Sequence, residues 1–305
     1  MAQTKYGQYI KSIPKFKDYG PGSYRQGTEM NDKFFGYDLN VRYGTFYNSG
    51  RLLPYQSQVC DYDQMQIWMG TDTYDLGYLG AEVDFTIGGE KNRITTSRAV
   101  SIPKGVTHGP TFIGPMENRF IMMNVSVTAN PKIKAVSKEP ADIPYADWRG
   151  TKYHDNVVEL GFKRNGPWHY GPKNPDTNGG YITDINGVGF EYNMSYESMN
   201  IAPYRFTPEP DKPHVHPYTE FLMFLGTDCE DLSEFPAEVE VCMGDEMEIH
   251  RINQPTVAIL PKSVPHCPVR VLEQSDSWIF IVLRPWGHGG DIFSGGEKTA
   301  REGRR

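Results

Sequence analysis

The chain has 305 residues, of which 38% are hydrophobic, and its formal net charge is −7. No run approaches the ~18 consecutive apolar residues of a membrane-spanning helix, so no membrane partner is expected. The acidic balance disfavours nucleic acid as a partner, because binding a phosphate backbone needs a basic surface.

The composition predicts an all-β protein of about two domains, at roughly 100–200 residues each. The chain contains 31 Gly and 23 Pro, and 13% of its residues are aromatic. Many turns between aromatic and β-branched segments are typical of β structure. Residues 1–6 lack the apolar segment of a secretory signal, and Cys60, Cys229, Cys242 and Cys267 form no C-x-x-C pair. We therefore expect a cytoplasmic protein with reduced thiols.

Short strand-like segments recur along the chain, and no long 3.6-residue periodicity competes with them. Some are continuous apolar runs, which favour strands buried on both faces, whereas Val239–Met243 alternates. Regular short strands between turns predict a sandwich or barrel. In chain order the segments are Ile67–Met69, Val83–Ile87, Phe120–Val125, Phe221–Leu225, Val239–Met243, Pro255–Leu260 and Trp278–Leu283.

The chain also repeats itself, which indicates a duplication. Several short matches recur in the same order, first at an offset of 156 and then at 158, so the second copy carries two extra residues in a loop. The matching pairs are Gly70-Thr71-Asp72 with Gly226-Thr227-Asp228, Ala81-Glu82-Val83 with Ala237-Glu238-Val239, Gly88 and Glu90 with Gly244 and Glu246, and Pro103-Lys104 and His108 with Pro261-Lys262 and His266.

The region between the copies is rich in proline and mixed charges, which predicts an extended connector. We therefore place an N-terminal barrel at 1–130, a linker at 131–152 and a C-terminal barrel at 153–305.

One group of residues in the second copy has the pattern of a metal site. His214 and His216 share a face of an extended strand, because alternate residues point the same way. Glu220 has matching parity, or reaches the site from an adjoining strand if Pro217 breaks this one. His266 is the fourth candidate ligand. Three imidazoles and one carboxylate suit Fe(II), Mn, Ni, Co, Cu or Zn, and the order of affinity does not choose among them.

His214-x-His216-x-x-x-Glu220, followed by Pro261-x-x-x-x-His266, resembles the two signature motifs of the cupin superfamily. Together with the duplication, this makes the chain resemble a bicupin over roughly 45–130 and 195–285. The resemblance implies two jelly-roll barrels of the double-stranded β-helix type, with the metal in the C-terminal one. The chain departs from the motifs at Pro208, Gly226, Ser263 and Arg270.

The same offsets show that the first copy has lost most of the ligand set. His214 corresponds to Gln58, His216 to Cys60 and Glu220 to Gln64, whereas His266 corresponds to His108. A neutral amide is a poor ligand for these metals, and His108 is better explained as a structural residue. We expect a metal-free pocket there, either filled or kept for assembly.

These observations support a metal-dependent enzyme acting on a small oxygenated organic acid or phenol. The resemblance implies dioxygenase-type oxidation first, with Fe(II) as the favoured metal. Lyase, isomerase or decarboxylase chemistry on a small carboxylated substrate is the second hypothesis, and a non-catalytic metal- or ligand-binding cupin is the third. The expected partner is a small-molecule substrate, and a homo-oligomer is compatible with the sequence.

Four further residues could contact an anionic substrate: Arg205, Tyr218, Arg270 and Arg284. Arg270 is favoured as a catalytic residue, because its four-residue distance from His266 places both on one face of a regular strand. Tyr218 lies between the ligands and could support a ligand or act as an acid.

Overall fold

The computed structural model describes residues 4–20, 25–51, 56–129, 131–136, 152–160, 163–164, 177–182, 193–199, 204–205 and 213–285. Nearly all of the regular structure in these ranges is β. The exceptions are one short helix, α1 (Asp32–Phe35), and two 3-10 turns, η1 (Gly7–Tyr9) and η2 (His154–Asn156). None of the described helices is long and apolar enough to cross a membrane. The predicted all-β class is confirmed.

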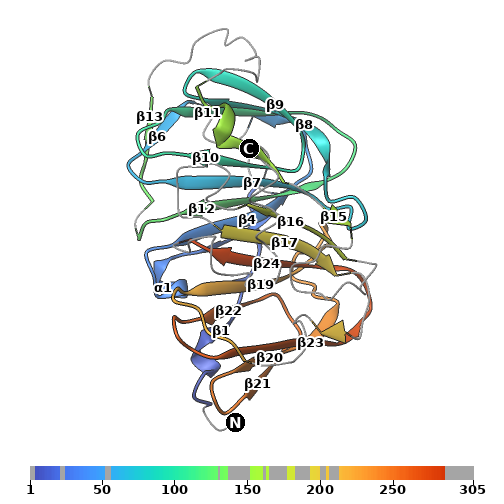
Figure 1. The fold of residues 1–305 in the computed structure, drawn as a ribbon. Coiled ribbons are helices and arrows are strands. Elements are labelled where there is room, and N and C mark those ends of the chain that lie inside the picture. Colours follow the sequence, from blue (N-terminus) through green and yellow to red (C-terminus); the bar gives the residue numbers. More distant parts are fainter. Residues whose placement is uncertain are drawn as a thin grey trace, which may run out of the picture.

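The N-terminal barrel occupies one half of the molecule and is built from two antiparallel sheets (Figure 1). The first contains, in spatial order, β14 (Val157–Glu159), β10 (Arg98–Ile102), β7 (Gln64–Gly70), β12 (Phe120–Ser126), β4 (Asn40–Phe46), β3 (Gln26–Met30) and β2 (Lys17–Asp18). The second contains β13 (Ile133–Ala135), β6 (Gln58–Cys60), β11 (His108–Met116), β8 (Tyr78–Ile87) and β9 (Glu90–Thr96), with β5 (Gly50–Arg51) paired to β11.

The C-terminal barrel repeats this arrangement in the other half of the molecule (Figure 1). Its larger sheet contains β1 (Ile10–Ser12), β22 (Thr256–Leu260), β19 (Glu220–Gly226), β24 (Trp278–Arg284), β17 (Asn193–Met199), β16 (Thr177–Ile182) and β15 (Lys163–Arg164). Its smaller sheet contains β18 (Tyr204–Arg205), β23 (His266–Gln274), β20 (Ala237–Met243) and β21 (Glu248–Ile252).

The two larger sheets pack against each other, which explains the continuous apolar runs in the sequence. On β19, Leu222 and Phe224 face the interior of the C-terminal barrel. Phe221 and Met223 face the opposite way, into a core that also contains Ile67 and other side chains from the N-terminal barrel. Each fully buried side chain of this size stabilises the fold by roughly 1.5–3 kcal/mol. The strands that contain the continuous apolar runs, β19, β22 and β24, are therefore buried on both faces, as predicted.

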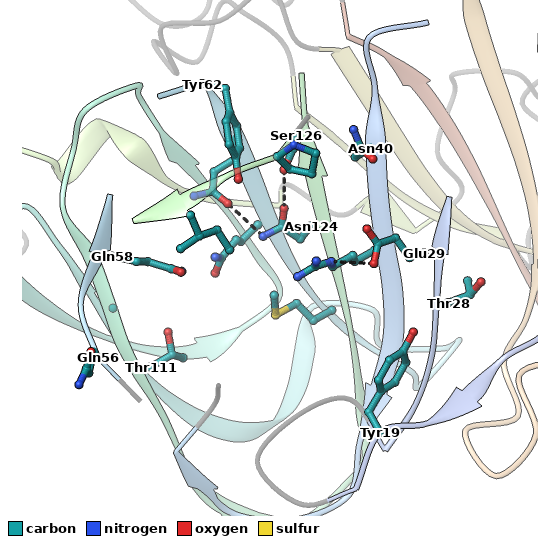
Figure 2. A pocket seen from close by; sticks show the side chains of 17 residues that line it. Tyr19, Thr28, Glu29, Asn40, Gln56, Gln58, Tyr62, Thr111, Asn124 and Ser126 are labelled. Atoms are coloured by element: carbon teal, nitrogen blue, oxygen red, sulfur yellow. Dashed lines mark hydrogen bonds and ion pairs between the residues drawn. The ribbon is translucent and has the colours of Figure 1, made fainter. Parts of the chain in front are cut away.

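The interior of the N-terminal barrel is polar at one end and surrounds a cavity of about 260 Å³ (Figure 2). Gln64, Gln66 and Asn124 lie on this wall, whereas Trp68 and Phe120 continue the same strands into the apolar part of the barrel. The pocket that the sequence predicts in the first copy is thus present.

Strand registers confirm the correspondence between the copies. Gln58 pairs with His108 in the N-terminal barrel, as His214 pairs with His266 in the C-terminal barrel. In the same way, Gln64 lies opposite Ile102, and Glu220 lies opposite Leu260.

The two extra residues of the second copy lie in one hairpin turn. The β8–β9 hairpin closes with Ile87 opposite Glu90, whereas the β20–β21 hairpin closes with Met243 opposite Glu248. The structural counterpart of Glu90 is therefore Glu248, and its assignment to Glu246 was wrong. A constant offset could not show on which side of the turn the insertion falls.

Each half of the chain contributes its first strand to the barrel of the other half. β1 pairs with β22 of the C-terminal barrel, and β14 pairs with β10 of the N-terminal barrel. In Figure 1 the N-terminus accordingly lies at the end of the molecule formed by β20 and β21. In addition, β13 pairs with β6 in the N-terminal barrel. The predicted boundaries, 1–130, 131–152 and 153–305, thus do not follow the strand pairing. They placed β1, β13 and β14 by their position along the sequence alone, whereas each of these strands pairs across a predicted boundary.

The segment before β1 is fixed to the C-terminal barrel by backbone hydrogen bonds and by one ring. The Glu248 carboxylate accepts the backbone N–H groups of Lys5 at 3.0 Å and Tyr6 at 3.1 Å. The Tyr6 ring covers Gly244, where a Cβ atom would lie 2.2 Å from the ring and where φ is +78°. Glycine is required here on both counts.

The segment before β14 is fixed to the N-terminal barrel in the same way. The Glu90 carboxylate accepts the backbone N–H groups of Lys152 at 3.0 Å and Tyr153 at 3.2 Å. A Cβ atom on Gly88 would lie 1.9 Å from the Tyr153 ring. A Thr-Lys-Tyr triplet, at 4–6 and again at 151–153, marks both segments in the sequence. This repeat is the signal in the sequence from which the docking of both segments could have been predicted.

Replacing either tyrosine should destabilise the barrel that the ring contacts, and not the barrel formed by the half of the sequence to which the tyrosine belongs. We expect Tyr6→Ala to lower the free energy of opening of β21 and β22 by about 3 kcal/mol, as for other buried aromatic truncations. Tyr153→Ala should lower the free energy of opening of β9 and β10 by a smaller amount, because the Tyr153 side chain is only half-buried. Residue-resolved amide hydrogen exchange measures both effects.

The control is Tyr74→Ala, since that side chain is 61% exposed. If Tyr6→Ala destabilised the N-terminal barrel alone, the exchange of first strands would be contradicted.

Candidate metal centre

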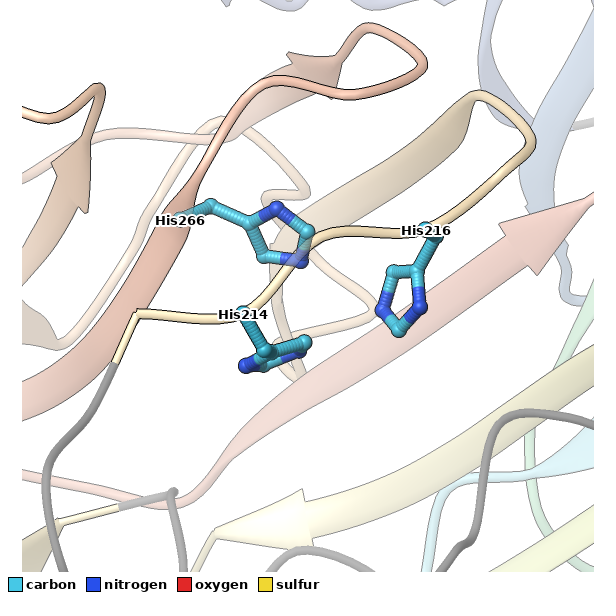
Figure 3. Close-up of side chains that lie close together, drawn as sticks. All are labelled: His214, His216 and His266. Carbon is cyan, nitrogen blue, oxygen red and sulfur yellow. The ribbon is translucent and has the colours of Figure 1, made fainter.

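Backbone pairing brings His214, His216 and His266 to one place at the opening of the C-terminal barrel. His214 and His266 exchange both backbone hydrogen bonds, at 3.0 and 3.1 Å. The N–H of Ser263 donates to the carbonyl of His216 at 3.0 Å. The segment with two histidines therefore runs beside the start of β23, and the three rings gather around one space (Figure 3).

The three histidines offer nitrogen donors that all lie within 4.8 Å of one another. Around one ion with bonds of ~2.1 Å, two donors are separated by at most about 4 Å, so the three nitrogens would have to approach one another by less than about 1 Å to bind it. Glu220, at the start of β19, adds a carboxylate oxygen. Its Oε2 lies 3.6 Å from His266 Nε2 and 3.9 Å from His216 Nε2. The structure thus brings together all four residues that the sequence nominated.

The ring of His266 is oriented by its own backbone. Its Nδ1 lies 2.9 Å from the carbonyl oxygen of Val264, which can only accept, so Nδ1 carries the proton. The lone pair of Nε2 then points into the cluster. This Nε2 is buried and has no hydrogen-bond partner among the described residues. Histidine ligands of metals are held in this way through their second nitrogen, so the arrangement fits a metal ion.

A buried ion pair fixes the carboxylate. Arg284, at the end of β24, donates from Nε to Oε1 of Glu220 at 2.5 Å. The side chains are 2% and 5% exposed. Burial acts to raise the pKa of Glu220, but the charge of Arg284, followed by those of His216 and His266 when these rings are protonated, outweighs it and lowers that pKa to about 2. The carboxylate is therefore ionised, with one oxygen toward the arginine and the other toward the histidines.

Tyr218, nominated as catalytic, and Arg284, nominated to contact substrate, both lie against residues of the site. The ring of Tyr218 stacks on His216, with 5.0 Å between centroids and 6° between planes. Tyr218 is thus a neighbour of one ligand and can position it. Arg284, a candidate for contacting substrate, is held by Glu220 instead. The side chain of Arg205 is outside the described part of the structure.

Arg270 does not share a face with His266. On β20, Val241 lies opposite Val269, but Met243 lies opposite His266, so β23 has one extra residue between these two pairs. This bulge reverses the alternation. Arg270 instead lies opposite Glu240, and its Nη1 is 3.8 Å from a Glu240 oxygen. The prediction from a regular strand was therefore wrong about its placement, and we assign no catalytic role to Arg270.

In the N-terminal barrel, the side-chain amide of Gln64 is hydrogen-bonded to the histidine nitrogen that corresponds to the metal-facing nitrogen of the other barrel. His108 Nδ1 lies 3.1 Å from the carbonyl of Val106, which repeats the orientation of His266. Its Nε2 then accepts a hydrogen bond from Gln64 Nε2 at 2.7 Å. Gln64 Oε1 in turn accepts from Asn124 at 3.1 Å. The lone pair used for a metal in the other barrel is satisfied here within the protein.

No family model and no curated protein matches the chain. The fold is similar to that of vicilin from Solanum lycopersicum (tomato), at 8% identity over 92% of this chain and 86% of that chain, with a TM-score of 0.60. A structure of oxalate decarboxylase gives 8% identity over 92% and 77%, with a TM-score of 0.56. AerE from Microcystis aeruginosa gives 12% identity over 90% and 99%, with a TM-score of 0.50.

The similarities to vicilin and to oxalate decarboxylase each extend over 92% of this chain, and so over both barrels. The bicupin fold that the motifs and the duplication predicted is therefore confirmed. At these identities the similarity establishes the fold and not the activity.

Removing the arginine should leave Glu220 as an uncompensated buried charge. We expect Arg284→Met to destabilise the metal-free protein by about 3–5 kcal/mol, and the double variant Arg284→Met/Glu220→Leu to recover most of that loss. Chemical denaturation after treatment with a chelator measures both. Arg251→Met is the matched control, because that arginine pairs with Glu238 but is 67% exposed, so it should change stability by under about 1 kcal/mol. Equal effects of the two single variants would contradict the assignment.

The buried His108 should make the stability of the N-terminal barrel depend on pH. Burial lowers the pKa of His108 to about 4, from an ordinary value of about 6.5. The unfolded chain therefore takes up a proton that the folded state rejects, and stability falls as the pH drops from about 6.5 to 4, by up to about 3 kcal/mol. His108→Gln should flatten this part of the profile in urea titrations. An unchanged slope in the variant would show that another group is responsible.

Proposed function

We propose that the chain is an enzyme that uses one divalent transition metal, held in the C-terminal barrel by His214, His216, Glu220 and His266. The observation that carries the proposal is the convergence of three imidazoles within 4.8 Å, beside a buried carboxylate and with the His266 Nε2 unsatisfied. Without an ion, a buried acceptor in this state would cost about 1–3 kcal/mol.

The charges around the site favour an anionic substrate. The histidines would bind as neutral ligands, and the negative charge of Glu220 is balanced by Arg284. The two positive charges of the ion would therefore remain uncompensated by the protein. A small oxygenated organic acid would supply the missing negative charge, and we propose this substrate class.

The protein residues would define the position and the surroundings of the reaction. His266 and Glu220 are buried, whereas His214 is exposed, so the site opens toward the side of His214. Arg284 keeps the Glu220 carboxylate ionised and fixes its orientation, and Tyr218 supports His216 through ring stacking. A bound divalent ion would polarise a substrate oxygen as a Lewis acid, and Fe(II) would in addition allow chemistry with O2.

For the reaction, we propose oxidation by O2 with Fe(II) as the metal. A non-oxidative reaction such as decarboxylation is the second candidate, favoured by the structural similarity to oxalate decarboxylase. Both reactions use the same ligands, so the metal requirement can be tested before the reaction is known.

We expect the purified chain to bind about one divalent transition metal, as measured by mass spectrometry of the metal content. His216→Ala and Glu220→Gln should each lower metal affinity by at least about tenfold, because each removes a ligand. The matched control is His108→Gln in the N-terminal barrel, which should retain the metal. Equal metal content in all four proteins would contradict the proposed site.

The reaction is then tested by loading the protein with Fe(II) without oxygen and adding O2 with a panel of small keto and hydroxy acids. Substrate-dependent O2 uptake that is lost in His216→Ala supports the oxidation. Release of CO2 without O2 uptake would replace it with the non-oxidative candidate.

A further inference from the structure

We propose that the pocket of the N-terminal barrel binds an uncharged, hydroxyl-rich small molecule of the size of one sugar or polyol. The cavity of about 260 Å³ lies just below the roughly 300–1,000 Å³ of pockets that take drug-sized ligands. Its wall is dominated by amide and hydroxyl groups, which include Gln56, Gln58, Tyr62, Gln66, Thr111 and Asn124. This second site does not depend on the metal of the other barrel.

The charges of the pocket favour a neutral ligand. Among the described lining residues, the ionised side chains are Glu29 and Arg42, which form an ion pair with Arg42 Nε 3.4 Å from Glu29 Oε2. The wall therefore has no net charge. Tyr62 stays protonated, because burial raises the pKa of its hydroxyl. Neither a carboxylate nor an ammonium group would find an uncompensated charge of opposite sign among these residues.

One hydrogen-bond acceptor in the wall of the pocket is unsatisfied among the described residues. Gln58 Oε1 is buried and has no hydrogen-bond partner among the described residues. In Figure 2 the side chains of Gln58 and Thr111 extend from one wall toward the space bordered by Asn124 on the other side. A buried acceptor without a donor is unfavourable, and a hydroxyl of a ligand would satisfy it.

A fixed chain of hydrogen bonds orients the opposite wall. Ser126 Oγ donates to Asn124 Oδ1 at 3.2 Å, and Asn124 Nδ2 donates to Gln64 Oε1 at 3.1 Å. Gln64 Nε2 then donates to His108, as described above. Each link fixes which end of an amide is donor or acceptor, so the wall is preorganised. Hydroxyl groups both donate and accept, and they match a wall that offers both functions.

The mouth of the pocket carries apolar surface that would suit the C–H faces of such a ligand. Tyr19 and Ile133 line the pocket, and each is 44% exposed. Figure 2 places Tyr19 at the edge of the cavity, away from Gln58. An aromatic ring at the edge and polar groups inside would bind a molecule with both apolar faces and hydroxyl edges.

Isothermal titration of the metal-bound protein tests the proposal. The probes are D-glucose, D-galactose, D-mannose, D-xylose, sorbitol and myo-inositol, with D-glucuronate and D-glucosamine as charged analogues. We expect at least one neutral probe to bind with a millimolar or lower Kd, and to bind at least about tenfold more tightly than both charged analogues. If no neutral probe binds, or if a charged analogue binds as tightly, the proposal is overturned.

Two variants locate the binding. Gln58→Leu removes the unsatisfied acceptor, so the Tm should stay the same or rise. The Kd for the neutral probe should increase by at least about tenfold. Arg251→Met in the other barrel, where the side chain is 67% exposed, should leave the affinity unchanged. Unchanged binding in Gln58→Leu, or loss of binding in Arg251→Met, would overturn the assignment to this pocket.

Discussion

The carboxylate of Glu220 is a buried charge inside the C-terminal barrel, and a buried charge is tolerated only with an opposite charge beside it. Arg284 provides that charge from the neighbouring strand. The pairing leaves one carboxylate oxygen directed at His216 and His266, so the same interaction that allows the burial also orients the acid for a metal. The site in this barrel depends on the ion pair as much as on the histidines.

The N-terminal barrel has the same backbone arrangement with neutral groups in these places. Gln64 stands where the other barrel has Glu220, and Ser126, opposite it in the register of the sheet, stands where that barrel has Arg284. With no acid to balance, no arginine is needed, and the amide can hydrogen-bond to His108. One duplicated scaffold thus carries a charged site in one copy and a neutral, amide-lined pocket in the other.

Much of this could be predicted from the sequence, because the ligand spacing and the repeat are local patterns. Alternation of extended residues was sufficient to predict that His214 and His216 lie together, although the described residues 213–219 form an isolated bridge at His214 and no strand. It was not sufficient for Arg270, since one extra residue in β23 reverses the alternation and leaves no mark in the spacing. The exchanged first strands were also missed, because β1 docks on residues more than 240 positions away. The pairing of Glu220 with Arg284 could not be predicted either, because it depends on β19 and β24 being neighbours in the sheet.

We infer that the two barrels have separated in function, with the metal in the C-terminal one only. Anomalous diffraction at the absorption edge of the bound metal tests it most directly. We expect a single strong peak between His214, His216 and His266, in contact with Glu220, and no peak beside His108. A peak between His108 and Gln64, or none beside the three histidines of the metal-loaded protein, would contradict it.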